Sequence, residues 1–306
     1  ILCHNGCFNM CHYKGVPNDQ DLSDSLHLAR CAVNAEMMQW GKHHIDKTYS
    51  SKTVHIVGGG IGGMEAARVL KLRGHKPVIH EKSNELGGAF IAASAESYKG
   101  KLRDLLAWYK RQMKELDIEV RLGDEVKDVS TFGGDPVIVA TGAVPRVLRR
   151  VPGNEKMVEA CDFLLGKKDV GETVAVIGGG LTGCEIAYEL ALHGKKPIIV
   201  EMKDDLVAQK GVCLANSSYL REWFALNEVP VYLETALKEV KDGAIVCAGK
   251  DGSDFELACD SVISCAGYIP APLTEKRSGV QLIGDCRAVG NLRSVVWEAY
   301  EAAMKI

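Results

Sequence analysis

The sequence predicts an α/β fold with two related domains, preceded by a cysteine-rich segment. Its 306 residues suffice for two domains at about 150 residues each. Residues 53–82 align without a gap on residues 173–202, and half of the aligned positions are identical. Each copy contains an apolar strand, a glycine turn, a helix and a second apolar strand. Two such βαβ units this far apart predict two separate nucleotide-binding folds.

Composition narrows the class of protein. With 37 Lys and Arg against 40 Asp and Glu, the net charge of -3 does not favour nucleic acid or an anionic membrane as a partner. The 46% hydrophobic content excludes a disordered chain. No stretch reaches the roughly 20 apolar residues of a membrane span, and no secretory signal is recognisable. We therefore expect a cytoplasmic protein, and the first residue, Ile1, leaves open a partial polypeptide with an upstream domain.

The first glycine turn has the G-x-G-x-x-G spacing of a Rossmann-like dinucleotide-binding fold. Gly58 permits a tight turn, Gly60 allows close approach of a pyrophosphate, and Gly63 lets the helix pack near the sheet. The helix N-terminus then faces the phosphate charge. Glu81, next to Lys82, ends the second strand, where its carboxylate can accept hydrogen bonds from ribose hydroxyls. We take all five as candidate nucleotide-binding residues.

The second copy repeats the arrangement with Gly178, Gly180, Gly183 and Glu201. An acid at this place, rather than an arginine, favours the free 2'-hydroxyl of NADH over the 2'-phosphate of NADPH. Glycines that serve only turn geometry are the alternative. Because the complete unit occurs twice, the sequence favours two nucleotide sites.

Three further motifs distinguish the first copy. They are Leu86-Gly87-Gly88, Ala140-Thr141-Gly142 after an apolar strand, and Gly284-Asp285 near the C-terminus. These motifs resemble the flavin-side signatures of flavoproteins with two dinucleotide domains. The resemblance implies FAD in the first copy, with the Asp on its ribityl chain and the N-terminus of the following helix directed at the flavin ring. It implies NAD(P)H in the second copy. The implied flavin-side residues are Gly88, Ala140, Thr141, Gly142, Gly284, Asp285, Ser294 and Val295.

The local composition of the sequence predicts the domain boundaries. We expect an iron-sulfur segment over residues 1–50 and an FAD-binding domain over 51–150 and 264–306. The NAD(P)H-binding domain, residues 151–263, is then an insertion within the FAD-binding domain.

The 11 cysteines form two groups. Four precede the first fold, and three of these lie so close together that a metal centre is favoured, because neighbouring thiolates need a cation. These candidate ligands are Cys3, Cys7, Cys11 and Cys31. The other seven occur singly, as expected of buried thiols. Zinc on Cys and His ligands, or free thiols, remain alternatives to a cluster.

At these cysteines the chain resembles a known family. The segments Gly6-Cys7-Phe8-Asn9-Met10-Cys11 and Cys31-Ala32-Val33-Asn34 are similar to the [4Fe-4S] segment of the 2,4-dienoyl-CoA reductase, 2-enoate reductase and trimethylamine dehydrogenase group. The family register puts the first ligand at His4, one position after Cys3. The resemblance covers essentially the whole chain and matches the C-terminal half of those proteins.

The resemblance implies a route for electrons. They pass from NADH through FAD to the cluster, and then to FMN in an N-terminal TIM barrel that reduces an activated C=C bond of an enoate or dienoyl-CoA. That barrel needs about 250 residues, for which this chain has no room. No acid-base catalytic residue is therefore assigned. Two alternatives stay open: an amine-dehydrogenase-like module with ADP in the first fold and an electron-acceptor flavoprotein as partner, or a non-catalytic nucleotide-binding scaffold. A homo-oligomer is also left open.

Overall fold

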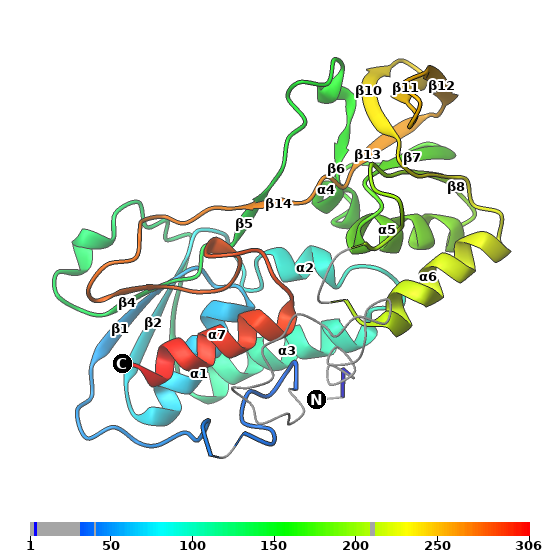
Figure 1. Ribbon diagram of the computed structural model, residues 1–306. Helices are drawn as coiled ribbons and strands as arrows, with labels where there is room; N and C mark the ends of the chain where they lie inside the picture. The colour runs from blue at the N-terminus through cyan, green and yellow to red at the C-terminus, as the bar shows by residue number, and fades with distance from the viewer. Residues whose placement is uncertain (1–2, 5–30, 40, 209–211) are drawn as a thin grey trace.

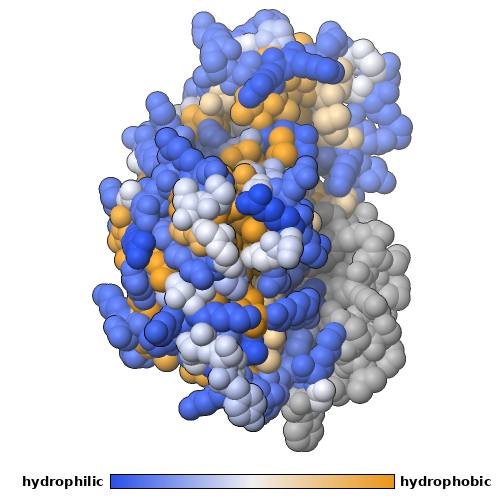
Figure 2. Space-filling view, turned by 90° about the vertical axis from the view of Figure 1, so that its left-hand side faces the viewer, coloured by the Kyte–Doolittle hydropathy of each residue, from blue (hydrophilic) through white to orange (hydrophobic). Residues whose placement is uncertain are grey.

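Two five-stranded sheets, joined by a two-stranded ribbon, form the framework of the molecule (Figure 1). The computed structural model describes residues 3–4, 31–39, 41–208 and 212–306. Within these ranges, no helix is long and apolar enough to cross a bilayer. Polar residues dominate the face seen in Figure 2, and only small apolar areas interrupt them.

The first sheet has the strand order β15-β4-β1-β2-β3, and all of its pairings are parallel. Its strands are β1 (Thr53–Val57), β2 (Lys76–Glu81), β3 (Glu119–Leu122), β4 (Val137–Val139) and β15 (Val280–Leu282). Helices α1 (Ile61–Arg73), α3 (Gly100–Glu115) and α7 (Leu292–Met304) contribute with the strands to one buried core. Alternation along β1 sends Val54 and Ile56 into this core and His55 to the opposite face.

The opposite face of the first sheet is covered by the crossover between β3 and β4. It contains the short helix η3 (Val129–Phe132), whose Phe132 ring stacks on His55 with centroids 4.0 Å apart. A smaller apolar cluster, including Val57 and Val139, lies under this crossover. Both faces of the central strands are therefore buried, as is usual for a parallel sheet.

The second sheet repeats the plan with the order β6-β13-β7-β8-β9, again in parallel. Its strands are β6 (Val158–Glu159), β7 (Thr173–Ile177), β8 (Lys196–Val200), β9 (Val231–Tyr232) and β13 (Ser261–Ser264). The associated helices are α4 (Ala160–Leu164), α5 (Leu181–Leu192) and α6 (Leu214–Leu226). An antiparallel sheet of β10 (Ala236–Lys241), β11 (Ala244–Ala248) and β12 (Asp254–Ala258) packs on the other face.

The ribbon between the two folds consists of β5 (Ala143–Pro145) and β14 (Tyr268–Pro270), paired antiparallel. The chain leaves the first fold along β5 and returns along β14 to form β15, η5 (Gly284–Cys286) and α7. The second fold is thus inserted in the first, and the α/β fold with two Rossmann-like domains is confirmed. Two shorter elements are α2 (Ala89–Ala93), next to the first glycine turn, and η4 (Asn154–Lys156).

Candidate functional site: two dinucleotide cradles

The first glycine turn is built so that two of its glycines are required by packing and one faces open space. Gly58 has φ +109°, and a Cβ there would lie 2.4 Å from the carbonyl oxygen of Ala140. A Cβ on Gly63 would lie 1.9 Å from the carbonyl oxygen of Gly58. A Cβ on Gly60 would meet only the carbonyl oxygen of Gly87, at 3.9 Å. The open side of Gly60, at the start of α1, therefore fits a diphosphate.

The carboxylate of Glu81 is fixed beside this turn. Its Oε2 accepts a hydrogen bond from the Gly59 amide at 2.7 Å, and its Oε1 accepts one from the Ser83 amide at 2.8 Å. Glu81 is buried, and each oxygen retains a second lone pair for a ribose hydroxyl. Lys82, the next residue, is exposed, and its contact with a nucleotide stays a prediction.

The second turn reproduces this geometry. Gly178 has φ +112°, and a Cβ on Gly183 would lie 1.8 Å from the Gly178 carbonyl oxygen. Gly180 precedes α5 with φ -70°, close to the φ of -72° that Gly60 adopts before α1. The Oε2 of Glu201 accepts from the Gly179 amide at 2.6 Å. Both candidate sites thus present the same glycine and carboxylate arrangement. We call them the first cradle (Gly58, Gly60, Gly63 and Glu81) and the second cradle (Gly178, Gly180, Gly183 and Glu201).

The glycine motifs do not predict one difference between the copies. Gly87 donates its amide hydrogen to the Gly59 carbonyl at 2.9 Å, and Val207 makes the equivalent bond to Gly179 at 2.7 Å. Gly87 has φ +130°, whereas Val207, fully buried, has φ +49°. A β-branched residue in this region is an outlier. Extending the repeat alignment beyond its second strand would have found it, because the same offset places Val207 opposite Gly87.

The flavin-side motifs gather at the first cradle. Gly88 lies against Gly60, whose Cα would be 3.4 Å from a Cβ on Gly88. Ala140, at the end of β4, donates its amide to Val57 at 2.8 Å, and Thr141 donates its hydroxyl to the Ala271 carbonyl at 2.7 Å. Gly142 follows with φ +74°. These residues are contributed by the carboxyl ends of adjacent strands, where ligands bind in open α/β sheets.

The last two motif residues complete the same edge. Gly284 has φ +63° and donates its amide to Glu298 at 2.8 Å. The Oδ1 of Asp285 accepts from the Gly290 amide at 3.0 Å, and burial raises the pKa of this carboxyl. Its position at the strand end fits a hydrogen-bonding role toward a flavin chain.

The N-terminus of α7 lies on this edge as well. Asn291 and Ser294 form a reciprocal capping box, in which Ser294 N donates to Asn291 Oδ1 at 3.0 Å and Asn291 N donates to Ser294 Oγ at 2.9 Å. Val295 packs against the first glycine turn, because its Cγ1 would be 3.1 Å from a Cβ on Gly62. The helix start is therefore held close to the first cradle.

The cysteine segment is described only in part. Cys7 and Cys11 lie outside the described residues, Cys3 is exposed and Cys31 is half-buried. Burial lowers the pKa of His4, the alternative first ligand. Among the residues that the structure describes, no three His, Cys, Asp or Glu side chains are grouped for a metal ion. The four-cysteine site stays a prediction.

The seven cysteines beyond residue 150 are free thiols. Burial raises the pKa of Cys184 to about 12 and that of Cys247 to about 11. Thiols this reluctant to ionise are poor nucleophiles at neutral pH. The group as a whole comprises Cys161, Cys184, Cys213, Cys247, Cys259, Cys265 and Cys286.

Two matching cradles on two parallel sheets, with flavin-side motifs at one of them, define a flavoprotein oxidoreductase with two dinucleotide domains. Residues 52–291 match the family of pyridine nucleotide-disulphide oxidoreductases, and the chain belongs to this family. Membership implies FAD and NAD(P)H as cofactors, and the glycine turns have the space and the carboxylates to hold them.

Individual relatives agree with this class. The chain is 36% identical over 284 residues to the cinnamate reductase of Clostridium sporogenes, covering 90% of this chain and 42% of that protein. It is 32% identical to the NADH oxidase of Thermoanaerobacter brockii, covering 90% of this chain and 44% of that protein. A solved 2-naphthoyl-CoA reductase in complex with 2-naphthoyl-CoA superposes with a TM-score of 0.82 at 26% identity, covering 91% of this chain and 44% of that one.

These relatives confirm the resemblance to the enoate reductase group, and they agree with the oxidoreductase class. The chain spans less than half the length of each of these proteins.

Proposed function

We propose that this chain is the electron-input portion of an enoate-type reductase. It would take a hydride from NADH on the second cradle to FAD on the first, and pass electrons through a [4Fe-4S] cluster on Cys3, Cys7, Cys11 and Cys31. An FMN-binding TIM barrel would receive them and reduce an activated C=C bond. The observation that carries this proposal is the duplicated cradle, with Glu81 and Glu201 held in the same way.

The assignment of FAD to the first cradle is supported by the neighbours of each turn. Gly88 and Val295, at the start of α7, lie against the first turn, and Gly142 and Asp285 follow the ends of neighbouring strands. Within the described residues the second turn lacks equivalents of Asp285 and α7. We accordingly assign residues 51–150 and 264–306 to FAD and residues 151–263 to NAD(P)H. The strand order of the two sheets supports these boundaries.

The preference for NADH over NADPH rests on Glu201. Its carboxylate is held by the amides of Gly179 at 2.6 Å and Lys203 at 2.8 Å, so it cannot easily turn away from a ribose. A fixed negative charge there repels a 2'-phosphate and accepts hydrogen bonds from a 2'-hydroxyl.

The protein residues bind and orient in this scheme. FAD, when bound, can accept the two electrons of a hydride together and release them one at a time. The glycine amides at the start of α1 would hold its diphosphate charge, and Glu81 would hold the adenosine ribose. The N-terminus of α7 presents a partial positive charge that stabilises negative charge on a reduced ring.

The partner domain is supported by length and by the names of the relatives. Proteins more than twice as long, among them a cinnamate reductase and a 2-naphthoyl-CoA reductase, contain a portion similar to this chain. Cinnamate is an enoate, so we propose an activated alkene as the final acceptor.

Anaerobic titration with NADH tests the electron-input role. We expect the holoprotein to contain FAD and its oxidised-flavin absorbance to bleach with one equivalent of NADH, faster than with NADPH. A flavin that stays oxidised in excess of both nucleotides would refute the proposal.

A matched pair of variants tests the assignment of the cradles. Glu201→Ala should weaken NADH binding about tenfold or more, which is about 1.4 kcal/mol, and spare FAD content. Glu81→Ala should do the reverse. Equal losses of both nucleotides in each variant would show that the two folds are assigned wrongly.

A further inference from the structure

The loop of residues 94–99 joins α2 to α3 in the first fold and also makes polar contacts with α5 of the second. The Ser97 amide donates to Glu189 Oε1 at 2.9 Å, and the Ser97 hydroxyl donates to Glu189 Oε2 at 2.8 Å. Lys99 Nζ lies 2.8 Å from Glu185 Oε2. We call residues 94–99 the latch loop.

The ion pair in this contact is shielded from water. The side chain of Lys99 is 11% exposed and that of Glu185 is 20% exposed. Lys99 also contacts Glu96 Oε1 at 3.1 Å, and the Glu96 side chain is only 1% exposed. Lys99 thus shares its charge between one carboxylate in each fold. A pair this sheltered is screened less by salt than an exposed one.

An aromatic contact reinforces the latch loop. The ring of Tyr98 meets that of Tyr188 edge-on, with centroids 5.2 Å apart, and its hydroxyl donates to the Glu185 carbonyl at 3.3 Å. Tyr188 packs in turn on Trp223 of α6, with centroids 4.7 Å apart. The contact therefore reaches beyond α5 into the core of the second fold.

The latch loop is itself held in shape by α3. Arg103 Nη1 donates to the carbonyls of Ser94 at 2.8 Å and Glu96 at 2.7 Å, and its Nη2 donates to the Ser97 carbonyl at 3.1 Å. One guanidinium thereby fixes three successive parts of the loop to the first fold. A displacement of α5 would have to break the contacts with the loop, because the loop cannot simply follow it.

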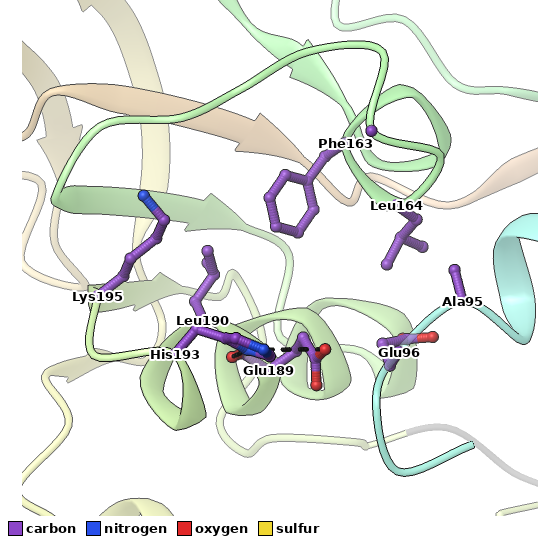
Figure 3. A pocket seen from close by; sticks show the side chains of 9 residues that line it. Ala95, Glu96, Phe163, Leu164, Glu189, Leu190, His193 and Lys195 are labelled. Carbon is purple, nitrogen blue, oxygen red and sulfur yellow. Dashed lines mark hydrogen bonds and ion pairs between the residues drawn. The ribbon is translucent and has the colours of Figure 1, made fainter. Parts of the chain in front are cut away.

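A hollow lies on one side of this contact. A cavity of about 320 Å³ lies beside the latch loop, between Ala95 and Glu96 of the first fold and α4 and α5 of the second (Figure 3). Phe163 and Leu164 of α4 line this space together with Leu190 of α5, and all three belong to the apolar core of the second fold. The covalent connections between the folds are the two short strands β5 and β14. Helix α2 of the first fold also lies against α4 of the second, so the latch loop adds polar contacts to the restraint that this helix pair and the ribbon provide.

We propose that the latch loop orients the second cradle toward the first, and that Ser97 and Lys99 are positioning residues for hydride transfer between the two nucleotides. This rests on the proposed function. α5 begins at Leu181, directly after Gly180, and Glu185 lies four residues, or about 6 Å, along it. At its other end the latch loop follows α2, which begins directly after Gly88. The loop thus bridges the two nucleotide turns.

Orientation matters because the transfer is short-ranged. A hydride, which is one proton with two electrons, leaves the nicotinamide to give NAD⁺ and joins the oxidised flavin to give its reduced anion. The two reacting atoms must approach to about 3–3.5 Å, and a misplacement of about 1 Å can cost roughly 100-fold in rate. A second fold whose orientation relative to the first is less restrained should therefore transfer hydride more slowly, without weaker nucleotide binding.

The experiment compares the holoprotein with two latch variants, Lys99→Met and the double variant Ser97→Ala/Glu189→Gln. Anaerobic stopped-flow measurement should show a limiting rate of flavin reduction lowered about tenfold or more, with the Kd for NADH and the FAD content unchanged. Hydrogen exchange of the latch loop and of α5 should become faster, and small-angle scattering should show a wider distribution of particle dimensions. Lys99→Met leaves Glu96 buried without its cation, so the double variant provides the test if this one fails to fold.

Two controls sharpen the result. Lys238→Met removes an ion pair with Asp254 within the second fold, at 2.8 Å and with both side chains 50% exposed, and should change none of the readouts. Lys99→Arg, which keeps the positive charge, should retain most of the wild-type limiting rate that Lys99→Met loses. A wild-type limiting rate in latch variants that exchange faster would overturn the proposal, and so would a higher rate. If wild-type flavin does not respond to NADH, the proposed function fails, whereas exchange and scattering still report whether the latch orients the folds.

Discussion

Val207 adopts a left-handed backbone conformation, with φ +49°, at the position of the second fold that corresponds to Gly87 in the first. Both residues donate their amide to the second glycine of the neighbouring turn. The backbone follows the same path in both folds, but the second fold has valine where the first has glycine, the residue best suited to positive φ. The strain lies beside a nucleotide turn, where such outliers concentrate.

Replacement of Val207 tests this strain. Val207→Ala and Val207→Gly both lose the buried side chain, but only glycine removes the left-handed penalty of about 1–2 kcal/mol. We expect Val207→Gly to unfold at a higher urea concentration than Val207→Ala, by about 1 kcal/mol in free energy of unfolding. In an ordinary helix the order would be reversed. Equal stability of the two variants would show that φ relaxes in solution.

Two glycines of the first turn should differ in their roles, one in FAD binding and the other in the stability of the apoprotein. Gly60 has φ -72° and open space beside it, so Gly60→Ala should change the free energy of unfolding of the apoprotein by no more than about 0.5 kcal/mol. The added methyl group would occupy the diphosphate space and lower FAD retention. Gly63→Ala, whose Cβ would meet the Gly58 carbonyl oxygen at 1.9 Å, should instead destabilise the apoprotein. Thermal unfolding and extracted FAD distinguish the two; similar losses of stability would contradict the assignment.

A partly buried histidine pair should make stability depend on pH. His55 Nδ1 lies 2.9 Å from His80 Nε2, and His80 Nδ1 lies 2.8 Å from Asp124 Oδ2. Burial, followed by the charge of His80, lowers the pKa of His55 against the opposing effect of Asp135. Arg121 on β3 lowers it further.

The sign follows from proton binding. Between the lowered pKa of His55 and 6.5 the unfolded chain binds more protons, so this contribution to stability is present above 6.5 and is lost as the pH falls. Urea unfolding at about pH 7.5 and about pH 5.5 should show the loss, and His55→Gln should make the slope shallower. His44→Gln, at a 71% exposed side chain, is the control and should leave the slope unchanged. An unaltered slope in His55→Gln would assign the effect elsewhere.

Trp297 connects the cysteine segment to α7. Its Nε1 donates to the Cys31 carbonyl at 2.9 Å, and its ring meets that of His43 with centroids 4.9 Å apart. Trp297→Phe removes the hydrogen bond, a change of about 1 kcal/mol, and should speed amide exchange in residues 31–39 about fivefold. Trp223→Phe in the second fold is the matched control. Unchanged exchange in Trp297→Phe would show that other contacts suffice to hold the segment.

Much of both cradles could be predicted from the order of the amino acids. A tight turn with φ near +110° and a helix packed at van der Waals distance demand glycine, so Gly58, Gly63, Gly178 and Gly183 mark those places in the sequence itself. The strands were predictable for a similar reason, because burial of both faces requires continuous apolar runs.

Other features depend on which elements become neighbours. Ser97 and Glu189 are 92 positions apart, and nothing local to either predicts their contact. His55 and His80 pair because parallel β1 and β2 place Val57 opposite His80, in a register that brings the two rings to one face. The roles of separate side chains in orienting one fold against the other are set by long-range packing.

The sequence alone therefore determined the two βαβ units, their glycine turns and their carboxylates, because each is a local requirement of backbone geometry. Only the tertiary structure decided that the latch loop contacts α5 and that the histidines pair. Those relationships arise from the packing of segments distant in the chain, and local sequence patterns do not encode them.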